Sequence, residues 1–160
     1  MKKPEKIMVA YDFSDYSKEA LKFGVYLADR LKCNMMIVNV VNQRDLDTIQ
    51  SEVAEIIWSK KKSSKFSIDK FVNDKKNDRL KRIDKVVEEV SARHLAVEIM
   101  IRAGVPFLEL IQAAKDGGVD LVIIGRKGRG DLAGVLFGTT AEKMSRYCKI
   151  SLLSCGEDMA

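Results

Sequence analysis

Five short apolar runs, most of them separated by stretches with helical periodicity, constrain the fold of this chain more than any other feature. Each run is five to nine residues long and rich in β-branched or long aliphatic side chains, which is typical of a buried strand. Strands that alternate with helices through short links form a parallel sheet with helices on both faces. The predicted strands are Lys6 to Tyr11, Cys33 to Val41, Leu95 to Arg102, Asp120 to Ile124 and Ile150 to Ser154.

The helices between these strands carry recognisable end signals. Ser14 or Asp15 can cap the first helix, because a short oxygen side chain accepts from the free N–H groups of a first turn. Pro106 can open a helix over Phe107 to Lys115, and the pair Gly117-Gly118 ends it. Further helices are predicted from Ile68 to Val90 and from about Thr139 to Tyr147.

The length of 160 residues predicts one domain, in which about 70% of the unfolded surface is buried on folding. No apolar run approaches the roughly 18 residues of a membrane span, and the N-terminus leads straight into the first strand. We therefore expect neither a membrane segment nor a signal peptide.

Cysteine and histidine usage limits the chemistry that the chain can perform. Cys33, Cys148 and Cys155 are odd in number and lack CxxC spacing, which fits a reducing cytoplasm better than a disulfide framework. His94 is the only histidine, so a His-based zinc site or a Ser-His-Asp triad has almost no material. We expect His94 to be a solvated residue near a helix end.

The net charge of +5 is concentrated in one segment. Between Ser59 and Arg82 there are ten Lys or Arg and three Asp, a balance of +7, which leaves the rest of the chain at −2. This distribution argues against a nucleic-acid binder built from the whole domain. A basic arm that binds nucleic acid or an acidic partner stays open as an alternative, although a charge run is usually a solvated face. The aromatic residues available there for stacking are Trp58, Phe66 and Phe71.

The segment DLVIIGRKGRGDLAGVLFGTT, residues 120–140, is rich in glycine but fits neither well-known phosphate loop. A Walker-A loop requires Lys and then Ser or Thr after its second glycine, whereas Asp131 and Leu132 stand there. A Rossmann fingerprint follows the first strand of its unit and needs an acidic residue about 20 residues further on, where this chain has Ile150. The glycines are Gly125, Gly128, Gly130, Gly134 and Gly138.

This loop nevertheless has the context of an anion site. It leaves a strand and enters a helix at Gly138, so its N–H groups can converge with the positive end of the helix dipole. Positive charge comes from Arg126, Lys127 and Arg129. In such sheets ligands bind beyond the carboxyl ends of the strands, where the strand order reverses, which selects this loop and the stretch from Asp12 to Asp15. A mobile glycine-rich surface loop is the alternative.

The spacing Gly125-x-x-Gly128, nine residues, then Gly138-Thr139 resembles the nucleotide-binding signature of the universal stress protein family. The resemblance extends over most of the chain, and residues 42 to about 82, a region that varies in the family, lack clear correspondence. The similar stretches are Val9 to Ser17 with the Asp-x-Ser turn, Ile37 to Val41, Arg102 to Pro106 with the Gly-x-Pro turn, and Gly138 to Met144.

The resemblance implies an α/β fold: a single domain over residues 1–160, with a doubly wound five-stranded parallel sheet of strand order 3-2-1-4-5 and helices on both faces. A variable basic insert occupies about residues 42–82. In the ATP-binding branch of the family, the residue matching Asp12 contacts the nucleotide near the ribose and the one matching Val40 packs around adenine. A helix cap for Asp12 and plain core for Val40 are the alternatives.

The resemblance also implies a cofactor and a set of binding residues. The expected cofactor is ATP or AMP, with the glycine loop around its phosphates, and Asp12 could hold Mg2+ directly or through water. The expected nucleotide-binding residues are Tyr11, Asp12, Phe13, Val40, Gly104, Ile124, Gly125, Lys127, Gly128, Arg129, Gly138, Thr139 and Thr140.

Three positions depart from the family pattern. Lys127 stands where a His is common, Asn39 where a His often ends the second strand, and Cys148-Lys149 lacks the usual Pro. None of these changes removes a backbone N–H from the loop, so nucleotide binding is still expected, with the preference for base and phosphates left open.

The residues near the loop favour binding over catalysis. Asp12, Asp15 and Asp131 have no His among them to orient or deprotonate a water. We therefore favour a nucleotide-responsive stress or regulatory protein, with slow ATP hydrolysis and docking on a transporter or enzyme as alternatives. An edge strand with few charges invites pairing, and the last strands commonly pair in this family. We therefore expect the protein to form a homodimer through the strand Ile150 to Ser154.

Overall fold

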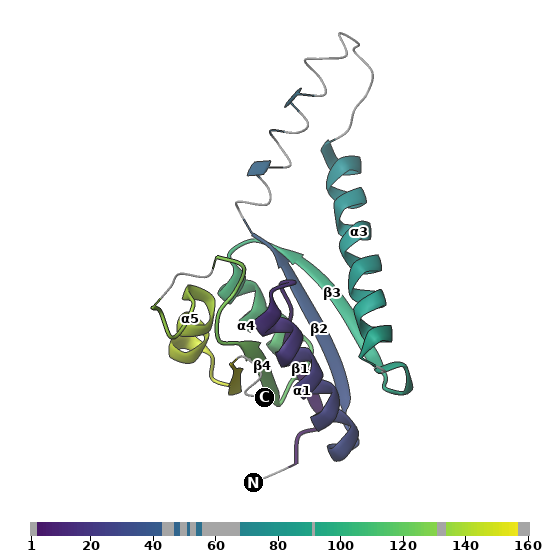
Figure 1. Cartoon of the computed structure of the whole chain (residues 1–160), viewed down its shortest axis with the longest axis vertical. Coiled ribbons are helices and arrows are strands. Elements are labelled where there is room, and N and C mark those ends of the chain that lie inside the picture. Colours follow the sequence, from purple (N-terminus) through teal and green to yellow (C-terminus); the bar gives the residue numbers. More distant parts are fainter. Residues whose placement is uncertain are drawn as a thin grey trace.

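The computed structural model describes residues 3–42, 47–48, 51, 54–55, 68–90, 92–130 and 134–156. Its centre is a five-stranded parallel sheet with the order β3-β2-β1-β4-β5 (Figure 1), which confirms the predicted topology. The ends of each strand lie within two residues of the predicted ones. The strands are β1 (Lys6–Ala10), β2 (Asn34–Val41), β3 (Val97–Ala103), β4 (Leu121–Gly125) and β5 (Ser151–Cys155).

The strand order reverses at β1. This strand pairs with β2 on one side and with β4 on the other, so that Ala10 lies opposite both Val38 and Ile124. From β2 the sheet continues to β3, and from β4 it continues in the other direction to β5. Because all strands are parallel, the carboxyl ends of β1 and β4 are neighbours. The turn after β1 and the glycine loop after β4 therefore start side by side.

The helices begin and end where the capping signals predict. The first, α1 (Asp15–Leu31), has Ser14 as its N-cap, whose side chain accepts from the N–H of Ser17. Helix α4 (Pro106–Asp116) has its proline in the first turn and Gly117 as its C-cap. The other described elements are α3 (Ile68–Glu89), the short 3-10 helix η1 (Ala92–His94) and α5 (Thr139–Tyr147).

An apolar core lies on each face of the sheet. Helices α4 and α5 cover one face, where Leu110 and Met144 are buried against the strands. Helices α1 and α3 cover the other face, where Leu21 and Ile83 are buried (Figure 1). The predicted arrangement of helices on both faces is therefore confirmed.

The segment between β2 and β3 is described only in part. Its second half forms α3, as predicted, and this helix packs on the sheet beside β3. Of the predicted helical turns from Val53 to Trp58, Ala54 and Glu55 are helical. The rest of those turns, and the predicted loop from Lys60 to Ser67, lie outside the described residues.

Two expectations about the surface can be compared with the structure. His94 is exposed at the end of η1, and its Nε2 lies 3.3 Å from Oδ1 of Asp29. Across the described ranges, no helix is long and apolar enough to cross a membrane.

Candidate functional site

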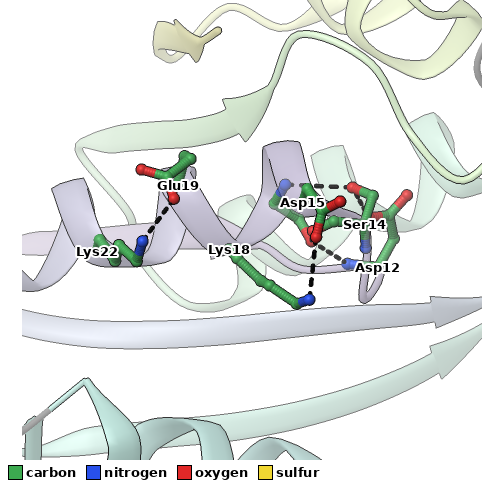
Figure 2. Close-up of polar contacts among 7 residues, drawn as sticks. Asp12, Ser14, Asp15, Lys18, Glu19 and Lys22 are labelled. Carbon is green, nitrogen blue, oxygen red and sulfur yellow. Dashed lines mark hydrogen bonds and ion pairs between the residues drawn. The ribbon is translucent and has the colours of Figure 1, made fainter. Parts of the chain in front are cut away.

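The turn that follows β1 is held by a network of short polar side chains (Figure 2). Asp12 accepts through Oδ1 from the backbone N–H of Ser14 at 3.0 Å and from the Ser14 hydroxyl at 2.5 Å. Ser14 Oγ accepts from the N–H of Ser17 at 3.2 Å, and Ser17 Oγ accepts from the N–H of Asp12 at 3.3 Å. Asp12 therefore orients the residue that caps α1 rather than capping the helix itself.

Phe13, the next residue in the turn, has a left-handed backbone with a φ of +69°. This conformation costs a residue with a Cβ about 1–2 kcal/mol, and it persists where the surrounding structure fixes it. The Phe13 ring meets the Tyr11 ring edge-on, with 5.2 Å between the centroids. The guanidinium carbon of Arg82 lies 4.0 Å from the Phe13 centroid. Since Arg82 belongs to α3, a helix of the basic insert contacts this turn.

Asn39, a polar residue inside β2, links the same turn to α3. It is 1% exposed. Its Nδ2 donates to the carbonyl oxygen of Tyr11 at 2.7 Å, and its Oδ1 accepts from Nη1 of Arg79 at 2.7 Å. This orientation of the amide satisfies both partners, because a carbonyl needs a donor and a guanidinium needs an acceptor. The peptide that joins Tyr11 to Asp12 is thereby held in place.

The glycine loop lies directly against the turn after β1. A Cβ on Gly128 would be 2.8 Å from Oδ2 of Asp12, so only glycine permits this approach without a shift. Gly138 closes the loop, because its N–H donates to the carbonyl of Arg126 at 2.9 Å. A Cβ on Gly138 would lie 3.3 Å from Cα of Lys127 and 3.5 Å from N of Gly128. The structure thus brings Asp12, Gly128 and Gly138 together at the switch point.

The N-terminus of α5 opens at the end of the same loop. Gly138 is its N-cap and offers no side chain, so no side-chain hydrogen bond caps the helix. The first N–H groups of a helix, here those of Thr139 and Thr140 among them, have no partner within the helix and carry the positive end of its dipole. Lys127 belongs to the loop, with its Nζ 5.8 Å from the Tyr16 ring centroid, and Arg129 is exposed. These groups can bind an anion.

The remaining expected residues lie around this centre. Gly125 ends β4, and Ile124 before it is buried in the same core as Val40 of β2. Gly104 follows β3, and its N–H donates to the carbonyl of Val41 at 3.0 Å. It therefore lies at the carboxyl end of the sheet, on the far side of β2 from Asp12. The acidic residue Asp131 lies outside the described residues.

Tyr11 is the buried titratable group of this region. Burial raises the pKa of its hydroxyl, an effect that the nearby Arg82 opposes. No described residue forms a hydrogen bond with Tyr11 Oη. Within the described part of the chain, no three His, Cys, Asp or Glu side chains gather as metal ligands. A metal ion beside Asp12 would therefore need further oxygens from a ligand or from water.

The contribution of α3 to this turn is not among the predictions from the sequence, although two features of the sequence indicate it. Asn39 interrupts an apolar strand, and a buried polar side chain needs a partner. Arg79 and Arg82 are the only arginines between Ser59 and Arg82, where every other basic residue is Lys. A guanidinium forms forked hydrogen bonds and lies flat on an aromatic ring, whereas an ammonium is a compact, strongly hydrated charge.

The fold and the site define a doubly wound α/β protein with a glycine-rich loop at the point where the strand order reverses. The model of the universal stress protein family matches residues 4–155, and the chain belongs to this family. It is 28% identical over 148 residues to universal stress protein YxiE of Bacillus subtilis (strain 168), covering 92% of this chain and 96% of the relative. It is 27% identical over 147 residues to universal stress protein MJ0577 of Methanocaldococcus jannaschii, covering 88% and 87%.

Solved structures share the fold. The structure of MJ0577 superposes with a TM-score of 0.78 at 19% identity, covering 99% of this chain and 100% of that one. A universal stress protein in complex with cAMP gives 0.62 at 18% identity, covering 97% and 98%. A universal stress protein family protein from Arabidopsis thaliana with AMP bound gives 0.58 at 14% identity, covering 98% and 94%.

Proposed function

We propose that this protein binds an adenine nucleotide, ATP or AMP, where the turn after β1 meets the glycine loop. The close approach of Gly128 to Asp12 carries the proposal, because a Cβ there would lie 2.8 Å from Oδ2 of Asp12 and glycine alone lets the loop and the carboxylate meet at the switch point. Family membership supports it, since related structures hold cAMP and AMP. In this role the protein is a nucleotide-responsive stress or regulatory module.

Each half of the proposed site suits one half of the nucleotide. The loop from Gly125 to Gly138 and the uncapped start of α5 offer N–H donors for phosphate, and Thr139 adds a hydroxyl. The Asp12 carboxylate can accept hydrogen bonds from ribose hydroxyls. Val40 at the carboxyl end of β2 is the residue proposed to pack around adenine, although its side chain is largely buried in the core under α4 and α5. The other proposed binding residues are Tyr11, Phe13, Gly104, Ile124, Lys127, Arg129 and Thr140.

Mg2+ would bind together with the nucleotide rather than before it. This ion usually takes one or two protein carboxylates plus water and phosphate oxygens. Asp12 offers one oxygen, Oδ2, because Oδ1 already accepts two hydrogen bonds from Ser14. A single carboxylate oxygen is a weak site by itself, so binding of the metal should require the phosphates.

The direct test is mass spectrometry of small molecules released when the purified protein is denatured, followed by calorimetric titration with ATP and AMP, each with and without Mg2+. ATP, ADP or AMP recovered near one molecule per chain would support the proposal. A protein that is purified empty and also fails to bind added ATP with Mg2+ would refute it.

We also propose that β5 pairs with its counterpart in a second copy to form a homodimer. Among the described strands β5 pairs with β4 alone and lies at the edge of the sheet, and Ser151–Cys155 contains no charged residue. Leu152 and Leu153 are only partly buried there. Uncharged edges invite pairing. Light scattering at micromolar concentration should give the mass of a dimer, and a monodisperse monomer would rule out this assembly.

A further inference from the structure

Helix α3 reaches the turn after β1 first through Arg79. The guanidinium donates to Oδ1 of Asn39 at 2.7 Å, and Nδ2 of Asn39 donates at 2.7 Å to the carbonyl of Tyr11. That carbonyl belongs to the same peptide as the N–H of Asp12, which donates to Ser17 Oγ. The hydrogen bond from Arg79 is of the stronger kind because its donor is charged, and the one to Tyr11 is shielded from water because Asn39 is buried. Arg79 therefore helps to hold, through Asn39, the peptide that joins Tyr11 to Asp12.

The second contact is that of Arg82 with Phe13, on the other side of Asp12. The guanidinium covers the ring at 4.0 Å, and the Phe13 backbone is in the left-handed region. A cation held over an aromatic face is stabilising, so this contact helps to fix a conformation that Phe13 would otherwise avoid. The helix itself is well anchored, since Ile83 and Val87 are buried in the core under it.

The residue types match these roles. The residue that makes the hydrogen bond and the one that stacks are both Arg, whereas the other basic residues between Ser59 and Arg82, such as Lys76 and Lys81, are Lys. A guanidinium is planar, donates in a fixed fork and stacks on rings, while an ammonium is a compact, strongly hydrated charge. The two arginines are therefore used for geometry as well as for charge.

We propose that Arg79 and Arg82 are positioning residues that hold the turn around Asp12 in its nucleotide-binding conformation, so that α3 sets the affinity of the site. This inference rests on the proposed nucleotide function. Neither arginine has to touch the ligand, because one fixes the peptide before Asp12 and the other fixes the side chain after it. A shift of α3 would change the affinity while leaving the glycine loop as it is.

The two halves of the nucleotide provide a readout that separates positioning from simple electrostatics. The turn faces the proposed ribose, and the glycine loop faces the proposed phosphates. Loss of a positioning residue should weaken the binding of AMP and of ATP by the same factor. Loss of a cation that only attracts phosphate should weaken the binding of ATP more than that of AMP, and added salt should reduce this difference between the two nucleotides.

Calorimetric titration with AMP and with ATP can measure this in four variants. Arg79→Met and Arg82→Met each remove one contact, and Lys81→Met removes an exposed cation of the same helix as the matched control. We expect Arg79→Met, which removes a charged hydrogen bond, to bind both nucleotides about tenfold more weakly. Arg82 is exposed, so loss of its cation–π contact in Arg82→Met should weaken both by about three- to fivefold. Lys81→Met should stay within about twofold of the wild type. Arg82→Lys should recover part of the affinity, because an ammonium can still cover Phe13. A loss confined to ATP, or an equal loss in Lys81→Met, would overturn the proposal.

Amide hydrogen exchange in the nucleotide-free protein tests the same contacts without a ligand. The N–H groups of Asp12 and Ser14 donate within the turn, so they should exchange faster in the two Arg→Met variants than in Lys81→Met, with exchange in β4 unchanged. Unchanged exchange in the turn overturns the positioning role. If the wild-type protein binds no nucleotide, the proposed function and the effect on affinity both fail, whereas the exchange result still decides whether α3 holds the turn.

Discussion

Replacement of Gly138 by Val tests the glycine loop most directly. Gly138 has a φ of −74° and a ψ of 161°, a conformation open to any residue, so the substitution introduces no backbone strain. Its Cβ would lie 3.3 Å from Cα of Lys127, 3.5 Å from N of Gly128 and 3.7 Å from the carbonyl oxygen of Arg126. All three neighbours are backbone atoms. The loop itself must therefore move to admit the new side chain.

The expected loss of stability is small compared with the expected loss of binding. Overpacking costs about 1–3 kcal/mol in a closed core, and Gly138 lies at a partly exposed loop end, so the free energy of unfolding should fall by about 1 kcal/mol. A displaced loop that loses two N–H contacts to phosphate, each worth about 1.5 kcal/mol, would bind roughly a hundredfold more weakly.

Gly130→Val is the matched control within the same loop. A Cβ on Gly130 would meet no atom of the described residues within 4 Å, and its φ is not positive, so the same side chain can be added there without displacing them. Titration calorimetry with ATP and AMP, alongside urea denaturation, should show binding lost in Gly138→Val and changed by no more than about twofold in Gly130→Val. Unchanged affinity in a folded Gly138→Val protein, or an equal loss in both variants, would refute the reasoning.

Three further substitutions test the packing around the site by urea denaturation. Tyr11→Phe removes a buried hydroxyl that has no partner among the described residues, so the free energy of unfolding should rise by up to about 1 kcal/mol; a clear loss would reveal a hydrogen bond there. Burial raises the pKa of Tyr11, so the folded protein holds this proton more tightly than the unfolded chain does. Ionisation of Tyr11 therefore leaves the free energy of unfolding of the wild type unchanged below about pH 10 and lowers it as the pH rises through the folded-state pKa. Tyr11→Phe should lack this decrease. Gly24→Ala sets a Cβ 2.5 Å from Cγ2 of Val9 and should destabilise by about 1–2 kcal/mol in spite of the better helix propensity, whereas a neutral result would mean that α1 can shift. Ser14→Ala removes the N-cap of α1 and should cost about 1 kcal/mol, most of which Ser14→Thr should restore, because its hydroxyl can still accept from the N–H of Ser17 and donate to Asp12; equal stability of Ser14→Ala and wild type would contradict the capping role.

Most of the fold could be predicted because its signals are local. The bounds of α5 follow from Gly138 at its start and from the helical spacing after it, and Pro106 and Gly117 mark the two ends of α4. The sheet order came from the family resemblance and agrees with the alternation of strands and helices. In each case the informative residues lie within one or two turns of the feature that they determine.

The contacts of the turn with α3 could not be predicted in the same way. Arg79 lies forty residues from Asn39 in sequence, and they meet only because α3 packs beside β3 on the sheet face that also carries α1. The left-handed backbone of Phe13 has no local signal either, since glycine or asparagine is the usual choice there. Both features depend on tertiary packing, which neither periodicity nor capping rules describe.

The position of α3 gives the basic insert a role that its charge alone does not suggest. The ten basic side chains of this segment would by their charge alone suggest binding to an external polyanion. Arg79 and Arg82, however, use their guanidinium groups to contact Asn39 and Phe13 within the chain. If α3 sets the nucleotide affinity by a factor of about ten, the coupling is about 1.4 kcal/mol, within the range usual for linked sites. Linkage is reciprocal, so the nucleotide must then bias α3 by the same factor. A partner that binds the exposed face of α3, where Lys81 and Lys85 lie, would therefore bind with an affinity that depends on whether the nucleotide site is filled. A movement of α3 that breaks its two side-chain contacts with the turn would be large enough to couple the two sites.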